Sequence, residues 1–188
     1  MSDREGVVQA IQAAMFARRV VTLGGAVDQA AAEDLVASLL SLDALGDDPI
    51  ELRVDAHCDG LDIALLLMDT IDVLGVEVRV LCSGTLSGTL VGLLAVAGSR
   101  VMSLHARIRL CEPAVSFEGR ASEIASRAAH EQARLIALQA RLAERTGRPL
   151  EHIEADMQAG RYLTATQAQA YGLVDAVLGT DAGGELSQ

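Results

Sequence analysis

Residues 50–82, IELRVDAHCDGLDIALLLMDTIDVLGVEVRVLC, combine two alternating segments with an apolar segment between them. In 50–54 and 76–82, apolar side chains alternate with charged ones, which predicts two β-strands that each bury one face. Residues 62–71 are apolar nearly all round and follow a capping Asp62, which predicts a buried helix. A strand, a helix and a second strand in this order indicate an α/β domain with a largely parallel sheet.

The same alternation continues on both sides of this segment. Asp28 is placed to cap a helix with apolar positions at Leu35, Leu39 and Leu40. Gly84 is expected to open a turn, after which a helix of small residues runs to Gly98. Further strands are expected at 20–23 (ended by Gly24-Gly25), 101–104 and 108–110. Because the chain shows no repeats or linkers, we expect a single domain over residues 1–188.

A different composition begins after Gly119. Residues 122–146 contain neither Gly nor Pro and are rich in Ala, Arg, Glu and Gln, which predicts one long helix ended by Gly147 and Pro149. Its apolar stripe is confined to the second half, at Leu135, Leu138 and Leu142. We expect the helix to project and to pack against another subunit; the alternative is that it lies across its own domain.

The C-terminal third carries two more helix signals. Pro149 can start a helix with Leu150, Ile153 and Met157 on one side, and 164–167 form a capping-box pattern whose helix Gly172 ends. We expect the N-terminal residues and the tail after Leu178 to be frayed.

Composition narrows the functional class. The net charge is −11 and all 15 basic residues are arginine, which argues against nucleic-acid binding and against chemistry that needs a lysine. The three cysteines lie far apart, so we expect no zinc site. We also expect no cofactor. The thiols are expected to be reduced, as in a cytoplasmic protein. Neither a signal peptide nor an apolar stretch long enough to span a membrane is indicated.

Several segments together resemble the Clp protease proteolytic subunit family of the crotonase-like superfamily, from about residue 16 to 178. They are Arg19–Asp28, Met68–Ile71, Ala143–Glu151, Tyr162–Ala165 and Ala170–Asp175. The resemblance implies a spiral of ββα units with a protruding handle helix. The head would comprise about 16–118 and 148–178, and the handle, about 119–147, would join two heptameric rings.

The family has a Ser-His-Asp triad, and this sequence departs from it at each position. The nucleophile slot falls on Ser87, Gly88 or Thr89, because the turn holds one residue too many. The base slot, at the end of RIRLCEP (107–113), holds Cys111. A thiol cannot accept and return the serine proton as an imidazole does. The acid slot holds Gly160, although Asp156 lies one helical turn earlier.

Two further features concern the same region. The family's oxyanion turn is matched here by His57, Cys58 and Asp59, and a carboxylate at Asp59 would oppose a developing negative charge. A simpler interpretation of Gly84, Gly88 and Gly92 is that their four-residue spacing lets one helix pack closely on its neighbour.

These departures favour a catalytically inactive, structural or regulatory ring subunit. One alternative is an active endopeptidase with a displaced Ser87 or Thr89 nucleophile. Another is a cysteine hydrolase in which His57 serves Cys58 or Cys111, oriented by Asp55 or Asp59. His105 and His130 are expected to be surface or strand residues. A binder of acyl-coenzyme A is a weaker alternative, because the chain is acidic and lacks lysine.

The resemblance also implies partners. We expect a heptamer or tetradecamer of this chain, or a mixed ring with active paralogues. In the family, aromatic side chains on the strand before the oxyanion turn help to receive a loop of the ATPase partner. Here Glu51 and Arg53 occupy the outward positions, which disfavours docking of an apolar anchor.

Overall fold

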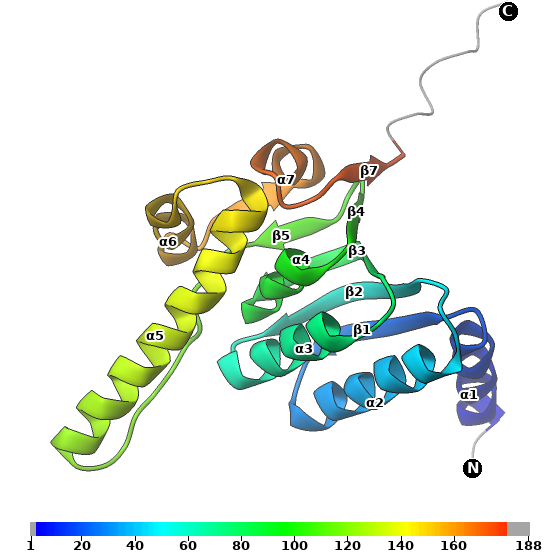
Figure 1. Ribbon diagram of the computed structural model, residues 1–188, viewed down its shortest axis with the longest axis horizontal. Coiled ribbons are helices and arrows are strands. Elements are labelled where there is room, and N and C mark those ends of the chain that lie inside the picture. The colour runs from blue at the N-terminus through cyan, green and yellow to red at the C-terminus, as the bar shows by residue number, and fades with distance from the viewer. Residues whose placement is uncertain (1–2, 180–188) are drawn as a thin grey trace, which may run out of the picture.

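A computed structural model describes residues 3–179 of the chain. Within these residues the strands form one sheet in the order β1-β2-β3-β4-β7, while β5 pairs with β3 and β6 (Figure 1). All pairs are parallel except β5–β6. The strands are β1 (Val20–Ala26), β2 (Ile50–Cys58), β3 (Val78–Gly88), β4 (Ser99–Ser103), β5 (Arg107–Arg109), β6 (Tyr162–Thr164) and β7 (Ala176–Leu178).

Helices connect the strands and cover the sheet. They are α1 (Asp3–Phe16), α2 (Gln29–Leu45), α3 (Leu61–Val73), the 3₁₀ helix η1 (Thr89–Gly92), α4 (Leu93–Val96), α5 (Ala121–Thr146), α6 (Leu150–Gln158) and α7 (Ala165–Tyr171). The predicted α/β class and the largely parallel sheet are therefore confirmed. None of the helices described in residues 3–179 has the length and apolar character that crossing a bilayer requires.

The alternation in β2 works as the sequence predicts. Every second side chain from Ile50 to Cys58 is buried, and those between them are partly or fully exposed. Helices α2 and α3 lie on one face of the sheet (Figure 1), and the buried side chains of β2 share one core cluster with theirs. Because side chains alternate along a strand, the exposed charged and polar side chains of β2 lie on the opposite face. We call this opposite face, with its row of exposed side chains on β2, β3 and β5, the polar face. In α2, Leu35 and Leu39 are buried as expected, whereas Leu40 is 47% exposed.

Two strands continue through glycines that were expected to end them. β1 runs through Gly24-Gly25 to Ala26, and β3 runs past Gly84 to Gly88. The pairing of β2 with β3 shifts where Val54 faces Cys82 and Ala56 faces Leu86, so β3 holds a bulge there.

Gly84 sits in this bulge because no side chain would fit. A Cβ at Gly84 would lie 2.2 Å from Cγ of Asp55. The Asp55 carboxylate instead accepts a 2.8 Å hydrogen bond from the Thr85 amide. The expected turn at Gly84 is therefore wrong. So is the interpretation that Gly84, Gly88 and Gly92 lie along one helix, since the first two belong to β3.

The long helix α5 confirms the prediction from its composition. Leu135, Leu138 and Leu142 are buried, and the side chains before Leu135 are largely exposed. In Figure 1 the first half of α5 extends away from the sheet, and the segment between β5 and α5 runs outward beside it to its far end. Gly147 ends the helix in the left-handed conformation at φ 69°. Division of the chain into a head and a handle remains an interpretation of this shape.

The two ends differ from the expectation in part. Residues 3–16, expected to be frayed, form α1. Near the C-terminus the Thr164–Gln167 capping box and the left-handed Gly172 are present as predicted. The expected frayed tail falls mainly on residues 180–188, which lie outside the described part of the chain.

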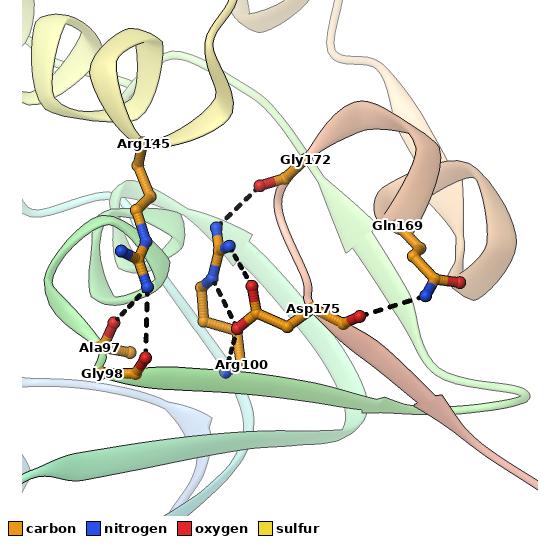
Figure 2. Close-up of polar contacts among 7 residues, drawn as sticks. All are labelled: Ala97, Gly98, Arg100, Arg145, Gln169, Gly172 and Asp175. Carbon is orange, nitrogen blue, oxygen red and sulfur yellow. Dashed lines mark hydrogen bonds and ion pairs between the residues drawn. The ribbon is translucent and has the colours of Figure 1, made fainter.

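A buried arginine fastens the C-terminal segment to the sheet. Arg100 on β4 is 6% exposed and donates hydrogen bonds to both carboxylate oxygens of Asp175 and to the Gly172 carbonyl (Figure 2). Asp175 also accepts a hydrogen bond from the Arg100 amide at 2.8 Å. Beside this cluster, Arg145 of α5 donates to the Ala97 and Gly98 carbonyls. Strand β7, α7 and the base of α5 are thus tied to one edge of the sheet.

Candidate active site

The turn after β3 is the first part of the site. Gly88 ends the strand at φ 72° and ψ −148°, a backbone conformation that residues other than glycine rarely adopt. A Cβ at Gly88 would lie 1.9 Å from the Cys58 carbonyl oxygen and 3.4 Å from Oδ1 of Asp59. The turn therefore depends on glycine for both its backbone conformation and its space.

Thr89 begins η1 and is fully buried. Its Oγ1 lies 3.1 Å from the Cys58 carbonyl oxygen and 3.0 Å from that of Gly60. The hydroxyl proton is thus held between two backbone acceptors, and no imidazole is among the hydrogen-bond partners of this side chain in the described chain. This is the geometry of a structural hydroxyl that ties two loops together.

Replacing Thr89 by valine should lower the free energy of unfolding by about 1 kcal/mol, because the shape is kept while the hydrogen bond to buried carbonyls is lost. Urea denaturation of the Thr89→Val variant measures this. Hydrolysis should be the same in wild type and variant. A variant as stable as wild type would show that the hydroxyl does not tie the loops.

The loop at 57–60 presents few free donors to the turn. The Gly60 amide donates to Sγ of Cys58 at 3.2 Å, and the Cys58 and Gly60 carbonyls are directed at Thr89. Stabilising an oxyanion requires free N–H groups aimed at the developing charge. Here carbonyl oxygens and the nearby Asp59 carboxylate occupy the side of the turn where such donors are needed.

Cys111 and Gly160, the residues expected in the base and acid slots, supply neither an imidazole nor a carboxylate. Cys111 is a partly exposed free thiol two residues after β5. Gly160 has φ 67°, and a Cβ there would face the Arg109 guanidinium at 3.5 Å. A cation thus stands beside the slot in which the resemblance implies an acid.

Asp156, one helical turn before Gly160, is held by hydrogen bonds from Tyr171 and Arg161. It accepts hydrogen bonds from Tyr171 at 2.7 Å and from Arg161 at 2.9 Å, and it lies 3.4 Å from His152. Partial burial raises the pKa of Asp156, but the hydrogen bonds from Tyr171 and Arg161 outweigh burial and hold the pKa below its ordinary value. The carboxylate therefore ties α6 to α7.

His57 lies on the polar face, away from Cys58. The two residues are consecutive in β2, with His57 exposed and Cys58 4% exposed on the opposite side. The strand pairing instead places His57 beside Ser87, Ser87 beside Arg109, and Arg109 beside Tyr162. Paired residues on neighbouring strands are about 4.8 Å apart and point to the same face.

His57, Ser87, Arg109 and Tyr162 thus form one row across β2, β3, β5 and β6. The last two of these residues were not predicted from the sequence. Arg109 and Tyr162 were assigned no role at the site, although the alternation of 107–110 indicates that Arg109 faces outward. The guanidinium carbon of Arg109 lies 5.3 Å from the centre of the Tyr162 ring, so the two side chains are in cation–π contact.

The remaining candidates have structural or surface positions. His105 and His130 are exposed, as expected. Burial raises the pKa of the Cys82 thiol to about 12, which makes it unreactive. Within residues 3–179, no three His, Cys, Asp or Glu side chains are grouped so that they could hold a metal ion.

Charged pairs occupy the start of the polar face. Nε of Arg53 lies 2.6 Å from Glu51 in β2, and Arg79 at the start of β3 is paired with Glu77 just before the strand at 2.9 Å. Because these side chains are partly exposed and already paired, an apolar anchor placed there would have to desolvate them without compensation.

Comparison with known proteins gives one consistent result. The chain matches the family described as Clp protease over residues 3–181. It is 33% identical over 168 residues to ATP-dependent Clp protease proteolytic subunit 1 of Nocardia farcinica, covering 87% of this chain and 85% of that protein. It is 29% identical over 169 residues to ATP-dependent Clp protease proteolytic subunit 2 of Mycobacterium bovis and of Mycobacterium tuberculosis, covering 87% of this chain and 79% of each.

Proposed function

This chain belongs to the Clp protease family, and we propose that it is a non-catalytic subunit of a Clp-type peptidase assembly. The mixed α/β structure with its mostly parallel sheet is consistent with the Clp protease and crotonase-like fold. The scaffold is therefore kept, and the proposal concerns what has become of its active site.

One observation carries the proposal: no side-chain nucleophile fits in the turn at Gly88. The backbone conformation is unfavourable for any other residue, and a Cβ would overlap the Cys58 carbonyl. The flanking Thr89 hydroxyl is buried, and the positions that resemble the base and acid hold Cys111 and Gly160. Loss of triad members costs roughly four or more orders of magnitude in rate, so little hydrolysis is expected.

We expect the purified protein to show neither labelling by a fluorophosphonate probe nor turnover of a fluorogenic peptide. The physical reason is that the Thr89 hydroxyl is bonded to two carbonyls and that, in the described residues, no hydrogen bond joins the Ser87 hydroxyl to a base. Gel fluorescence and intact-protein mass spectrometry measure labelling, with an active Clp proteolytic subunit as the positive control. Robust turnover that survives repurification, and that disappears in the Ser87→Ala variant, would overturn the proposal.

A displaced serine hydrolase is the second candidate, and the strand pairing favours it over a cysteine hydrolase. His57 and Ser87 are neighbours on the polar face, where an imidazole can approach a hydroxyl. If this pair is catalytic, Ser87→Ala and His57→Ala should each abolish turnover, whereas Cys111→Ala should not. The cysteine hydrolase has less support, because Cys58 is buried on the opposite face of β2.

Assembly is the activity we propose in place of catalysis. Members of the family form oligomeric rings. We propose that this chain forms a heptamer or tetradecamer, or joins a mixed ring with active paralogues, in the cytoplasm, and that α5 is a handle between rings. The thin apolar stripe and exposed first half of α5 support this. Native mass spectrometry, alone and with active paralogues, tests it, and a protein that stays monomeric in both samples would contradict it.

A further inference from the structure

The polar face holds a row of hydrogen-bond donors at the carboxyl ends of its strands. His57, Ser87 and Arg109 are neighbours on β2, β3 and β5, and all three lie on the polar face, partly or fully exposed. In α/β sheets, ligands characteristically bind outside the carboxyl ends of parallel strands. Within the described chain, none of these three side chains has a hydrogen-bond or ion-pair partner, so their donors are free for a ligand.

Arg109 is the cationic member of the row, and its guanidinium is held in place. It contacts the Tyr162 ring at 5.3 Å, and the nearest atom to a Cβ built at Gly160 is Nη2 of Arg109, at 3.5 Å. Stacking on a ring orients the planar guanidinium, so less side-chain entropy is lost when it binds an oxyanion with two N–H groups. The absence of a side chain at Gly160 leaves that approach open.

We propose that His57, Ser87 and Arg109 bind the C-terminal carboxylate of a peptide. Arg109 pairs with the carboxylate, while the Ser87 hydroxyl and the His57 imidazole donate to the carboxylate or to the last peptide carbonyl. Tyr162, which is 60% exposed, offers an apolar surface to the last side chain of the peptide.

Charge selects a carboxylate over a phosphate. Asp55 lies on the same face of β2, two residues before His57, and the chain carries a net charge of −11. A doubly charged phosphate would be repelled more strongly by these acids than a singly charged carboxylate. The proposal does not require that the protein be inactive, because it concerns binding by this chain alone.

The test compares an N-acetylated tetrapeptide ending in leucine as the free acid with the same peptide as the C-terminal amide. Both are titrated into the full-length protein and followed by isothermal calorimetry and by backbone-amide NMR shifts. We expect the free acid to bind about tenfold or more tighter than the amide, as for a charge-assisted hydrogen bond. The largest shifts should fall on residues 57, 87, 109 and 162.

Arg109→Gln should remove the preference for the free acid. Arg107→Gln is the matched control, because Arg107 lies on the same strand and face and its loss changes the net charge equally. It should leave the preference within about twofold, since only long-range attraction changes. Thermal melting checks that both variants are folded.

Three results would overturn the proposal: equal binding of acid and amide, equal loss in both arginine variants, or displacement of the peptide by inorganic phosphate at lower concentration than by acetate. Mass spectrometry of the same samples reports whether the peptide is cleaved. Cleavage would count against the non-catalytic function, whereas the absence of an acid preference in the wild-type protein would count against this site.

Discussion

Replacing Asp175 by alanine should lower the free energy of unfolding by about 3 kcal/mol. The reason is that Arg100 is 6% exposed and would keep its charge while losing its carboxylate partner. Breaking a buried pair on one side costs about 3–5 kcal/mol, and we expect the lower end because the Asp175 side chain is 44% exposed. Guanidinium denaturation followed by circular dichroism measures the change.

The matched control is Glu51→Ala, which removes one partner of the Glu51–Arg53 pair on the surface. That change should cost less than about 1 kcal/mol, because both side chains of the pair are exposed to water. If Asp175→Ala costs no more than Glu51→Ala, the Arg100 cluster does not fasten the C-terminal segment.

The pH dependence of the same variant has a definite sign. Partial burial raises the pKa of Asp175, but hydrogen bonds from Arg100 outweigh burial and lower the pKa below its ordinary value. Stabilisation by a carboxyl group with a lowered pKa is fully present above the unfolded-state value of about 3.9 and is lost as the pH falls through the folded-state value. Wild type should therefore lose more stability than Asp175→Ala on acidification below about pH 4. Melting temperatures that fall in parallel would contradict this.

Introducing a serine at Gly88 should not create an active site, and it should destabilise the protein by more than about 3 kcal/mol. The added Cβ would lie 1.9 Å from the Cys58 carbonyl oxygen, and the residue would keep an unfavourable backbone conformation. Because both atoms in the overlap belong to the backbone or to a Cβ, no rotamer change relieves it. Urea denaturation and peptide turnover of Gly88→Ser measure the two effects.

Gly147→Ala is the matched control for the cost of placing a side chain on a residue with positive φ. Gly147 also has a positive φ, 69°, but a Cβ there would meet nothing within 4 Å. The control should cost about 1–2 kcal/mol, as is usual for the left-handed conformation. The excess in Gly88→Ser is then the steric conflict with the 57–60 loop. A Gly88→Ser variant that is stable, and that reacts with a fluorophosphonate, would show that this loop moves and that only the nucleophile has been lost.

Local signals predicted much of the fold. The composition of 122–146 predicted α5, because a long run without Gly or Pro has few other stable conformations. The alternation in β2 and the Thr164–Gln167 capping box were equally local, since each depends on side chains within a few residues of one another. The course of β3 was not predicted, because Gly84 lies in a bulge formed around the side chain of Asp55 in another strand.

The amino-acid sequence by itself determined the class of fold, the family, and the absence of a histidine and an acid at positions 111 and 160, since these depend on residue identity and short-range pattern. Only the tertiary structure decided that Gly88 has no room for a side chain, that Thr89 is tied to the 57–60 loop, and that His57, Ser87 and Arg109 stand in one row. The physical reason is that strand register, set by a bulge and by long-range packing, determines which residues become neighbours.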